Sequence, residues 1–245
     1  MEIKRDNYVY DNVIEVEDES SIASRKFLAG VFSWMFVALS ISGLVAYLFA
    51  TNQALHDLVV NPETHRVTGL GLLAIFSPIV FQMVMSFGYN RLSYFTLSAL
   101  FISYASIMGI SLGIILLAFT TSSVLSIFLS AAAIFVIMAA AGYYTHQDLT
   151  GLGSILSMIF IGAFVASIIN WFIGSAQVDY ILSFVFVAVL IGLTAYYMQT
   201  LKRIGAGVEY GIASTKKLAL MGAFTLYILF INLFIMLLNL FGRRK

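Results

Sequence analysis

Polar residues recur at a regular spacing in a long apolar segment near the carboxyl terminus. Leu218–Phe241 carries no charge in 24 residues, yet Thr225, Asn232 and Asn239 occupy every seventh position. In a helix this spacing places all three side chains on one face. An amide in lipid is costly unless it finds a hydrogen-bond partner, so we expect this face to meet other helices or water. The pattern therefore predicts a polar seam along which an ion or small solute could pass.

The element that must carry this seam is a membrane-spanning helix. At about 1.5 Å per residue the segment is ~36 Å long, enough to cross a hydrocarbon core of about 30 Å. The whole chain is 61% hydrophobic and 10% charged, whereas soluble domains carry about 25% charged residues. We predict an all-α polytopic membrane protein in which the last helix is surrounded by the others.

Seven apolar runs are long enough to span a membrane, which divides the chain into a tail (1–26) and a transmembrane domain (27–245). The tail has seven acidic and four basic residues and lacks the apolar core of a signal peptide. We expect it to be disordered or to lie on a surface. The candidate spans are 27–50, 70–88, 92–118, 124–144, 152–173, 180–201 and 218–241.

The distribution of Lys and Arg predicts the orientation. With the amino terminus in the cytoplasm, nine basic residues lie on the inner side and four on the outer side. Three of those four close the chain, in the sequence Arg243-Arg244-Lys245. A re-entrant hairpin in the last run would move them inside, but no Pro or paired Gly lies at its midpoint. We therefore predict seven spans with a cytoplasmic amino terminus and an external carboxyl terminus.

Several function classes are excluded by what the chain lacks. It has no Cys and a net charge of +1, so thiol chemistry is excluded and nucleic-acid binding is disfavoured. No predicted span has an ionisable residue in its interior, which disfavours a proton pump or cation carrier. The three His residues lie in loops, and no histidine follows His146 to serve a nucleophilic Ser154. We expect no enzyme activity, no catalytic residues, no cofactor and no metal site.

Small residues spaced four apart occur in two of the predicted spans. This spacing lets two helix backbones approach closely, and helix packing within the bundle is its usual role. Homodimerisation through either face is the alternative, and the sequence leaves the oligomeric state open. The two sets are Ala105, Gly109 and Gly113 in the third span, and Gly162, Ala166 and Asn170 in the fifth.

Three motifs in the second half of the chain resemble the Bax inhibitor family (transmembrane Bax inhibitor motif proteins), in its bacterial branch. Residues 145–150 (THQDLT) resemble the family's Thr-Lys-x-Asp-Leu-Thr loop. Residues 196–199 (YYMQ), followed by Lys202, resemble its Tyr-Asp-Thr-Gln…Lys segment. Residues 226–234 (LYILFINLF) resemble the core of its last span, Leu-Tyr-Leu-Asp-Phe-Ile-Asn-Leu-Phe. Their order and spacing, together with the seven-span layout, agree with the family over about 220 residues.

The resemblance implies a seventh helix caged by six others and, in some members, a pH-sensitive calcium leak controlled by two aspartates. The corresponding positions here are Tyr197 and Leu229, so both acids are substituted. A carboxylate pair supplies oxygen ligands for Ca²⁺ and a shared proton, and neither substitute supplies a charge. We expect no calcium site inside the bundle. Tyr197 and Gln199 join the seam candidates, and we predict that the Asn232 amide bonds to Tyr197.

Two function classes remain open. The first is a Bax inhibitor-like ion, calcium-leak or small-solute pathway along the last helix, without the acidic gate. The second is a regulatory protein of membrane homeostasis and stress, for example a modulator of a membrane-bound AAA protease, which the acidic tail would suit. The alternative for the tail is a solvated end without function. In either class we expect a lipid bilayer as the surrounding medium, no nucleic-acid partner, and location in a bacterial inner membrane.

Overall fold

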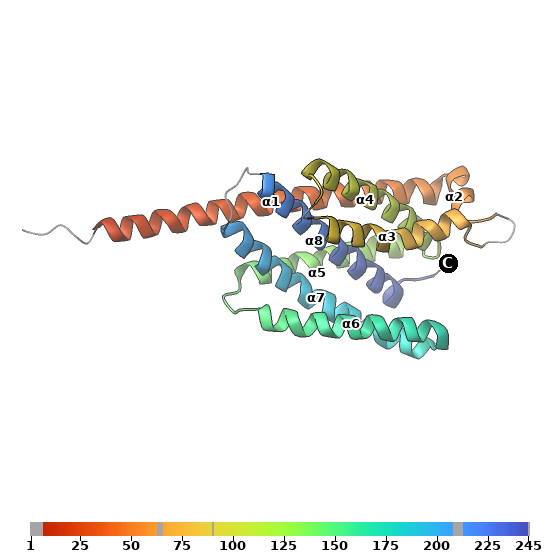
Figure 1. Ribbon diagram of the computed structural model, residues 1–245. Coiled ribbons are helices and arrows are strands. Elements are labelled where there is room, and N and C mark those ends of the chain that lie inside the picture. Colours follow the sequence, from red (N-terminus) through yellow and green to blue (C-terminus); the bar gives the residue numbers. More distant parts are fainter. Residues whose placement is uncertain (1–6, 63–65, 90, 208–212, 245) are drawn as a thin grey trace, which may run out of the picture.

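The computed structural model describes residues 7–62, 66–89, 91–207 and 213–244 (Figure 1). Seven of the helices in these ranges are long and apolar enough to cross a membrane, as predicted; the short α2 is the exception. The helices are α1 (Asn7–Thr51), α2 (Gln53–Val59), α3 (Gly69–Gly88), α4 (Tyr94–Leu117), α5 (Thr121–Tyr144), α6 (Thr150–Ile173), α7 (Ala176–Ala206) and α8 (Ala213–Phe241).

The first helix begins earlier than the sequence analysis predicts. α1 is one continuous helix of 45 residues from Asn7, so the expectation of a disordered tail is wrong for residues 7–26. Residues 1–6 lie outside the described part of the chain. Figure 1 shows the amino-terminal part of α1 extending beyond the other helices. α1 contacts the bundle at Ser24, whose hydroxyl donates to the Lys202 carbonyl at 3.1 Å, and at Phe27, which is fully buried.

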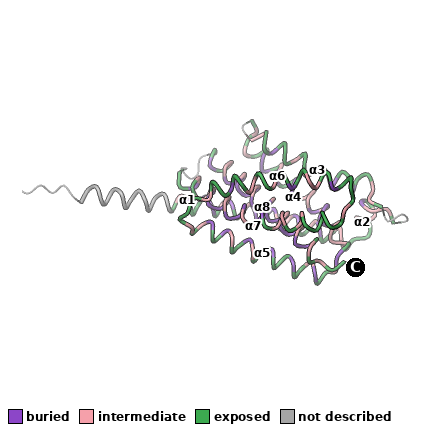
Figure 2. Tube along the Cα trace, turned by 90° about the horizontal axis from the view of Figure 1, so that it is seen from below, coloured by how far each residue is buried: buried purple, intermediate pink, exposed green. Residues whose placement is uncertain are grey.

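α8 is the central helix of the bundle, as predicted. In an apolar stretch of 18 residues in α8, 67% of the stretch is buried inside the bundle, compared with 39% or less in the corresponding stretch of every other span. It packs against α1, α4, α5 and α7, and in Figure 2 its buried residues lie in the middle of the bundle. Apolar burial does not organise this packing as it would in water, because lipid is equally apolar; close van der Waals contact and buried hydrogen bonds do.

The carboxyl-terminal end of the chain is fixed at the end of the bundle opposite to the start of α8 (Figure 1). α8 runs unbroken to Phe241, so the alternative of a re-entrant hairpin is wrong. Beyond it, the Thr120 amide donates to the Arg243 carbonyl, and the Arg243 amide donates to the Ser123 hydroxyl, each at 3.0 Å. These bonds hold the chain end against the corner between α4 and α5.

One of the two small-residue sets packs helices together. In α4, a Cβ added at Gly109 would lie 2.7 Å from the Ser42 carbonyl oxygen of α1, so the two backbones touch there. Ser42 adds a hydrogen bond of 2.8 Å to the Ala105 carbonyl and one of 2.6 Å to the Tyr227 hydroxyl of α8. In α6 the interpretation of packing within the bundle is wrong at Gly162, where a Cβ would meet open space.

The cage around α8 is incomplete on one side. α3 packs mainly on α4, and α6 packs on α7, so neither lies closely against α8. The space between α3, α6, α7 and α8 is occupied by cavities rather than by side chains. The polar face of α8 is turned toward this opening.

Candidate solute groove along α8

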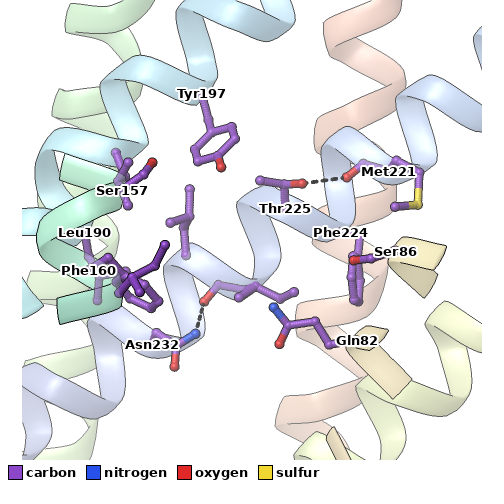
Figure 3. A pocket seen from close by; sticks show the side chains of 14 residues that line it. Gln82, Ser86, Ser157, Phe160, Leu190, Tyr197, Met221, Phe224, Thr225 and Asn232 are labelled. Atoms are coloured by element: carbon purple, nitrogen blue, oxygen red, sulfur yellow. Dashed lines mark hydrogen bonds between the residues drawn. The ribbon is translucent and has the colours of Figure 1, made fainter. Parts of the chain in front are cut away.

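A cavity of about 340 Å³ lies between α8 and the three helices around the opening (Figure 3). Phe160, Leu190 and Phe224 are among its apolar walls. Its polar lining comes from all four helices: Gln82 and Ser86 of α3, Ser157 of α6, Tyr197 of α7, and Thr225 and Asn232 of α8.

The α8 polar groups in this cavity are bonded within their own helix. The Asn232 amide nitrogen donates to the Ile228 carbonyl at 2.9 Å, and the Thr225 hydroxyl donates to the Met221 carbonyl at 3.0 Å (Figure 3). The predicted bond between Asn232 and Tyr197 is therefore wrong, although both residues line the same cavity. A carbonyl one turn back is a ready partner for such a side chain. This arrangement leaves the side-chain amide oxygen (Oδ1) of Asn232 available to a solute in the cavity.

Gln82 is a lining residue that the spacing argument on α8 did not identify. Its side chain extends from α3 toward α8 in Figure 3. Among the described residues, neither the Gln82 amide nor the Tyr197 hydroxyl has a protein hydrogen-bond partner. Water or a polar solute would therefore satisfy them. The only sequence signal for Gln82 is a lone amide in an apolar span, which does not reveal which helix it faces.

Two further cavities lie along α8 beyond the first. A second cavity of about 690 Å³ shares Asn232 and Gln82 with the first and extends to Met236. A third, of about 530 Å³, shares Met236 with the second and extends to Asn239. Thr225, Asn232 and Asn239 thus line three adjoining cavities in order, which we call the α8 groove.

The third cavity contains the charged end of the α8 groove. Asp179, in the first turn of α7, and Arg244 both line it. The Asp179 carboxylate is positioned by Asn170, which is 2% exposed and donates to it at 2.6 Å. Asn170 is itself held by the turn between α6 and α7, where it donates to the Ser175 carbonyl at 3.0 Å. Asn170 therefore orients a carboxylate, which its place in a small-residue set did not suggest.

Gln199 lies outside the α8 groove, in a different structural role. Its side chain is 5% exposed and fixes the loop between α5 and α6: its oxygen accepts from the Leu149 amide at 2.9 Å, and its nitrogen donates to the Gln147 carbonyl at 2.7 Å. The Lys202 ammonium donates to the Tyr143 carbonyl at 2.8 Å. The loop motif at 145–150 and the motif at 196–202 therefore meet as one clamp between α5, α6 and α7.

Asp148 is the acid of this clamp and stays ionised at low pH. Hydrogen bonds from the Thr150 hydroxyl at 2.6 Å and the Thr150 amide at 3.1 Å, followed by Arg203 at 2.9 Å, lower the pKa of Asp148 to about 2. Since the side chain is at the surface, this pairing orders the loop rather than forming a buried charge site.

The fold and the groove define a class: an all-helical, seven-span integral membrane protein with a central last helix and a largely neutral polar groove beside it. Residues 24–245 match the family model described as "Inhibitor of apoptosis-promoting Bax1". The chain belongs to the Bax inhibitor family.

Bacterial relatives cover nearly the whole chain. It is 36% identical over 220 residues to "Inner membrane protein YbhL" of Escherichia coli K12, covering 89% of this chain and 92% of that protein. It is 35% identical over 224 residues to a protein of Caulobacter vibrioides, covering 90% of each. It is 32% identical over 224 residues to protein RP147 of Rickettsia prowazekii, covering 90% of this chain and 91% of that protein. One relative is thus a bacterial inner membrane protein.

Proposed function

We propose that this protein conducts an ion or small polar solute across a bacterial inner membrane along the α8 groove. The observation that carries the proposal is the series of three adjoining cavities, lined in order by Thr225, Asn232 and Asn239. Irregular or polar surfaces at membrane depth are tolerated where they line a cavity that holds water. The protein acts without catalytic residues or a cofactor.

The chemistry of the groove favours a weakly binding pathway over a calcium site. In the first cavity the polar groups are amides and hydroxyls, and the family's acidic positions are Tyr197 and Leu229. Neutral oxygens can replace part of an ion's water shell without holding it tightly, which conduction requires. Without a carboxylate pair at this level, we expect a flux whose pH dependence does not come from these two positions. A role in calcium homeostasis would then need another control point.

Flux in liposomes tests the proposal. Purified protein is reconstituted, and K⁺, Ca²⁺ and small polar solutes are followed with and without a pH step. We expect measurable flux for at least one of them, and its loss in Asn232→Leu. The control is Thr194→Val, which also removes a polar group from a span: Thr194 is fully buried, bonds only within α7 and does not line the groove. Unchanged flux in a folded Asn232→Leu variant would contradict the proposal.

A second candidate function is that of an interaction partner, for example a modulator of a membrane-bound AAA protease. The observation that favours it is the helical extension of α1 from Asn7, beyond the bundle, over a strongly acidic stretch (EVEDE, 15–19). An acidic segment can be recognised by a cluster of Arg side chains on a partner.

Deleting residues 1–21 separates the two candidates, because the contacts of Ser24 and Phe27 with the bundle remain in place. A pathway protein should keep its flux after the deletion. A partner protein should lose co-purification of its membrane partner while the transmembrane domain still folds. Flux lost together with the acidic extension would contradict the assignment of transport to the α8 groove alone.

A further inference from the structure

A second groove, unrelated to the α8 groove, lies between α1 and α5 at the end of the bundle where α6 begins. It is an open groove of about 540 Å³, walled by α1 and α5, with Met198 of α7 lining it. Apart from one residue its lining is apolar or aromatic, from Leu28 and Phe32 on α1 to Phe135 and Tyr144 on α5. Between Arg25 and Phe32 the groove follows α1 for about 10 Å.

The exception is Arg25, which stands at the outer end of this groove. Its side chain is exposed, and no acidic side chain in the described part of the chain pairs with it. A second cation lies beside the same end: the Lys202 ammonium is 4.7 Å from the centre of the Tyr143 ring, which lines the groove. The hydrogen bond between Ser24 and the Lys202 carbonyl joins the two cationic segments.

We propose that this groove binds an anionic phospholipid, with its phosphate at Arg25 and Lys202 and the upper part of one acyl chain between α1 and α5. Charge complementarity selects this occupant. Two cations at the membrane–water boundary above an apolar channel match a negative headgroup above an acyl chain. Lys202 has donors to spare, since Tyr143 uses one of three. This site is independent of conduction along the α8 groove.

Native mass spectrometry of the full-length protein tests the headgroup. Dioleoyl-phosphatidylglycerol and dioleoyl-phosphatidylcholine are titrated separately, and the bound population gives an apparent Kd for each. A basic residue near the membrane surface contributes about 1 kcal/mol to binding an anionic lipid, so Arg25→Gln should weaken phosphatidylglycerol about five-fold. Phosphatidylcholine binding should barely change. Lys26→Gln is the matched control, because it removes a neighbouring exposed cation that does not line the groove.

A second pair of variants tests the acyl chain. Ala140 is an exposed residue lining the groove, and Ala141 is an exposed neighbour outside it. Ala140→Leu should fill the groove and weaken both lipids, whereas Ala141→Leu should bind as the wild type does. Inorganic phosphate should not displace phosphatidylglycerol, because it lacks the chain. Three results would each overturn the proposal. The first is an equal Kd for Arg25→Gln and Lys26→Gln, and the second is displacement of the lipid by phosphate. The third is a dimer of the wild type that Ala140→Leu dissociates.

Discussion

Tyr197 of α7 and Leu229 of α8 line the same cavity, at the two positions where the family resemblance implies aspartates. α7 and α8 pack directly on each other, so the two side chains belong to one local environment. A phenol and an aliphatic group there leave the cavity neutral. The chain therefore keeps the fold of the family but has no acidic side chain at either of these two positions.

Restoring both acids should create a calcium response. In the double variant Tyr197→Asp with Leu229→Asp, two carboxylates in one cavity would share a proton and offer oxygen ligands to Ca²⁺. We expect Ca²⁺ binding by calorimetry that strengthens from about pH 6 to pH 8, and a lower melting temperature without Ca²⁺. The neutral pair Tyr197→Asn with Leu229→Asn is the control. If the wild type bound Ca²⁺ as tightly as the double aspartate variant, the expectation that the wild-type bundle has no calcium site would be wrong.

The contact between α5 and α7 should tolerate no side chain at Gly142. A Cβ at this position would run into the Ala195 backbone carbonyl, which cannot move without shifting α7. We expect Gly142→Ala to lower stability by about 1–3 kcal/mol, as overpacking does, measured by unfolding in detergent. Gly151→Ala is the control: a Cβ there meets open space, so the change should be neutral or slightly stabilising. Equal effects would show that α5 and α7 are less tightly packed.

The arrangement into spans could be predicted from sequence because lipid leaves the backbone few options. A backbone without water must satisfy its hydrogen bonds internally, so each long apolar run becomes a helix. The predicted spans differ from the observed helices by a few residues at most ends, for example 180–201 against Ala176–Ala206. α1 is the exception: polarity alone suggested a disordered tail, but polarity does not prevent a charged segment from continuing an existing helix.

The groove was only half predictable, because spacing identifies a face of one helix and not what that face meets. The seventh-residue spacing correctly grouped Thr225, Asn232 and Asn239. It could not show that α3 and α6 stand away from α8, which brings Gln82 into the lining. Nor could it distinguish a polar side chain in a cavity from one that fixes a loop. Gln199, two residues from Tyr197, does the second.

The orientation prediction can be tested with single cysteines, since the chain has no native Cys. Nine of the thirteen Lys and Arg residues favour a cytoplasmic amino terminus, and seven spans then place the carboxyl terminus outside. A membrane-impermeant maleimide added to whole spheroplasts should label Lys245→Cys and leave Ile3→Cys unlabelled until lysis. Gln53→Cys, between the first two spans, should behave like Lys245→Cys. Labelling of both ends from one side would contradict the seven-span arrangement.

The loop clamp at Asp148 should give the protein an acid-dependent stability. Its bonds to Thr150, then to Arg203, hold the pKa at about 2 in the folded state, below the value of about 3.9 in an unfolded chain. A lowered folded-state pKa stabilises the fold fully above about pH 4 and loses that contribution as the pH falls toward 2. In Asp148→Asn this part of the pH dependence should disappear. Because the neutral amide resembles the protonated acid, melting at neutral pH should fall by about as much as the wild type loses between pH 4 and 2, an amount kept small by the exposure of the pair. Arg203→Gln should have a smaller effect than Asp148→Asn, since both Thr150 donors remain. Melting in detergent between pH 2 and 7 checks this, and equal losses in the wild type and Asp148→Asn between pH 4 and 2 would assign the acid sensitivity to other carboxylates.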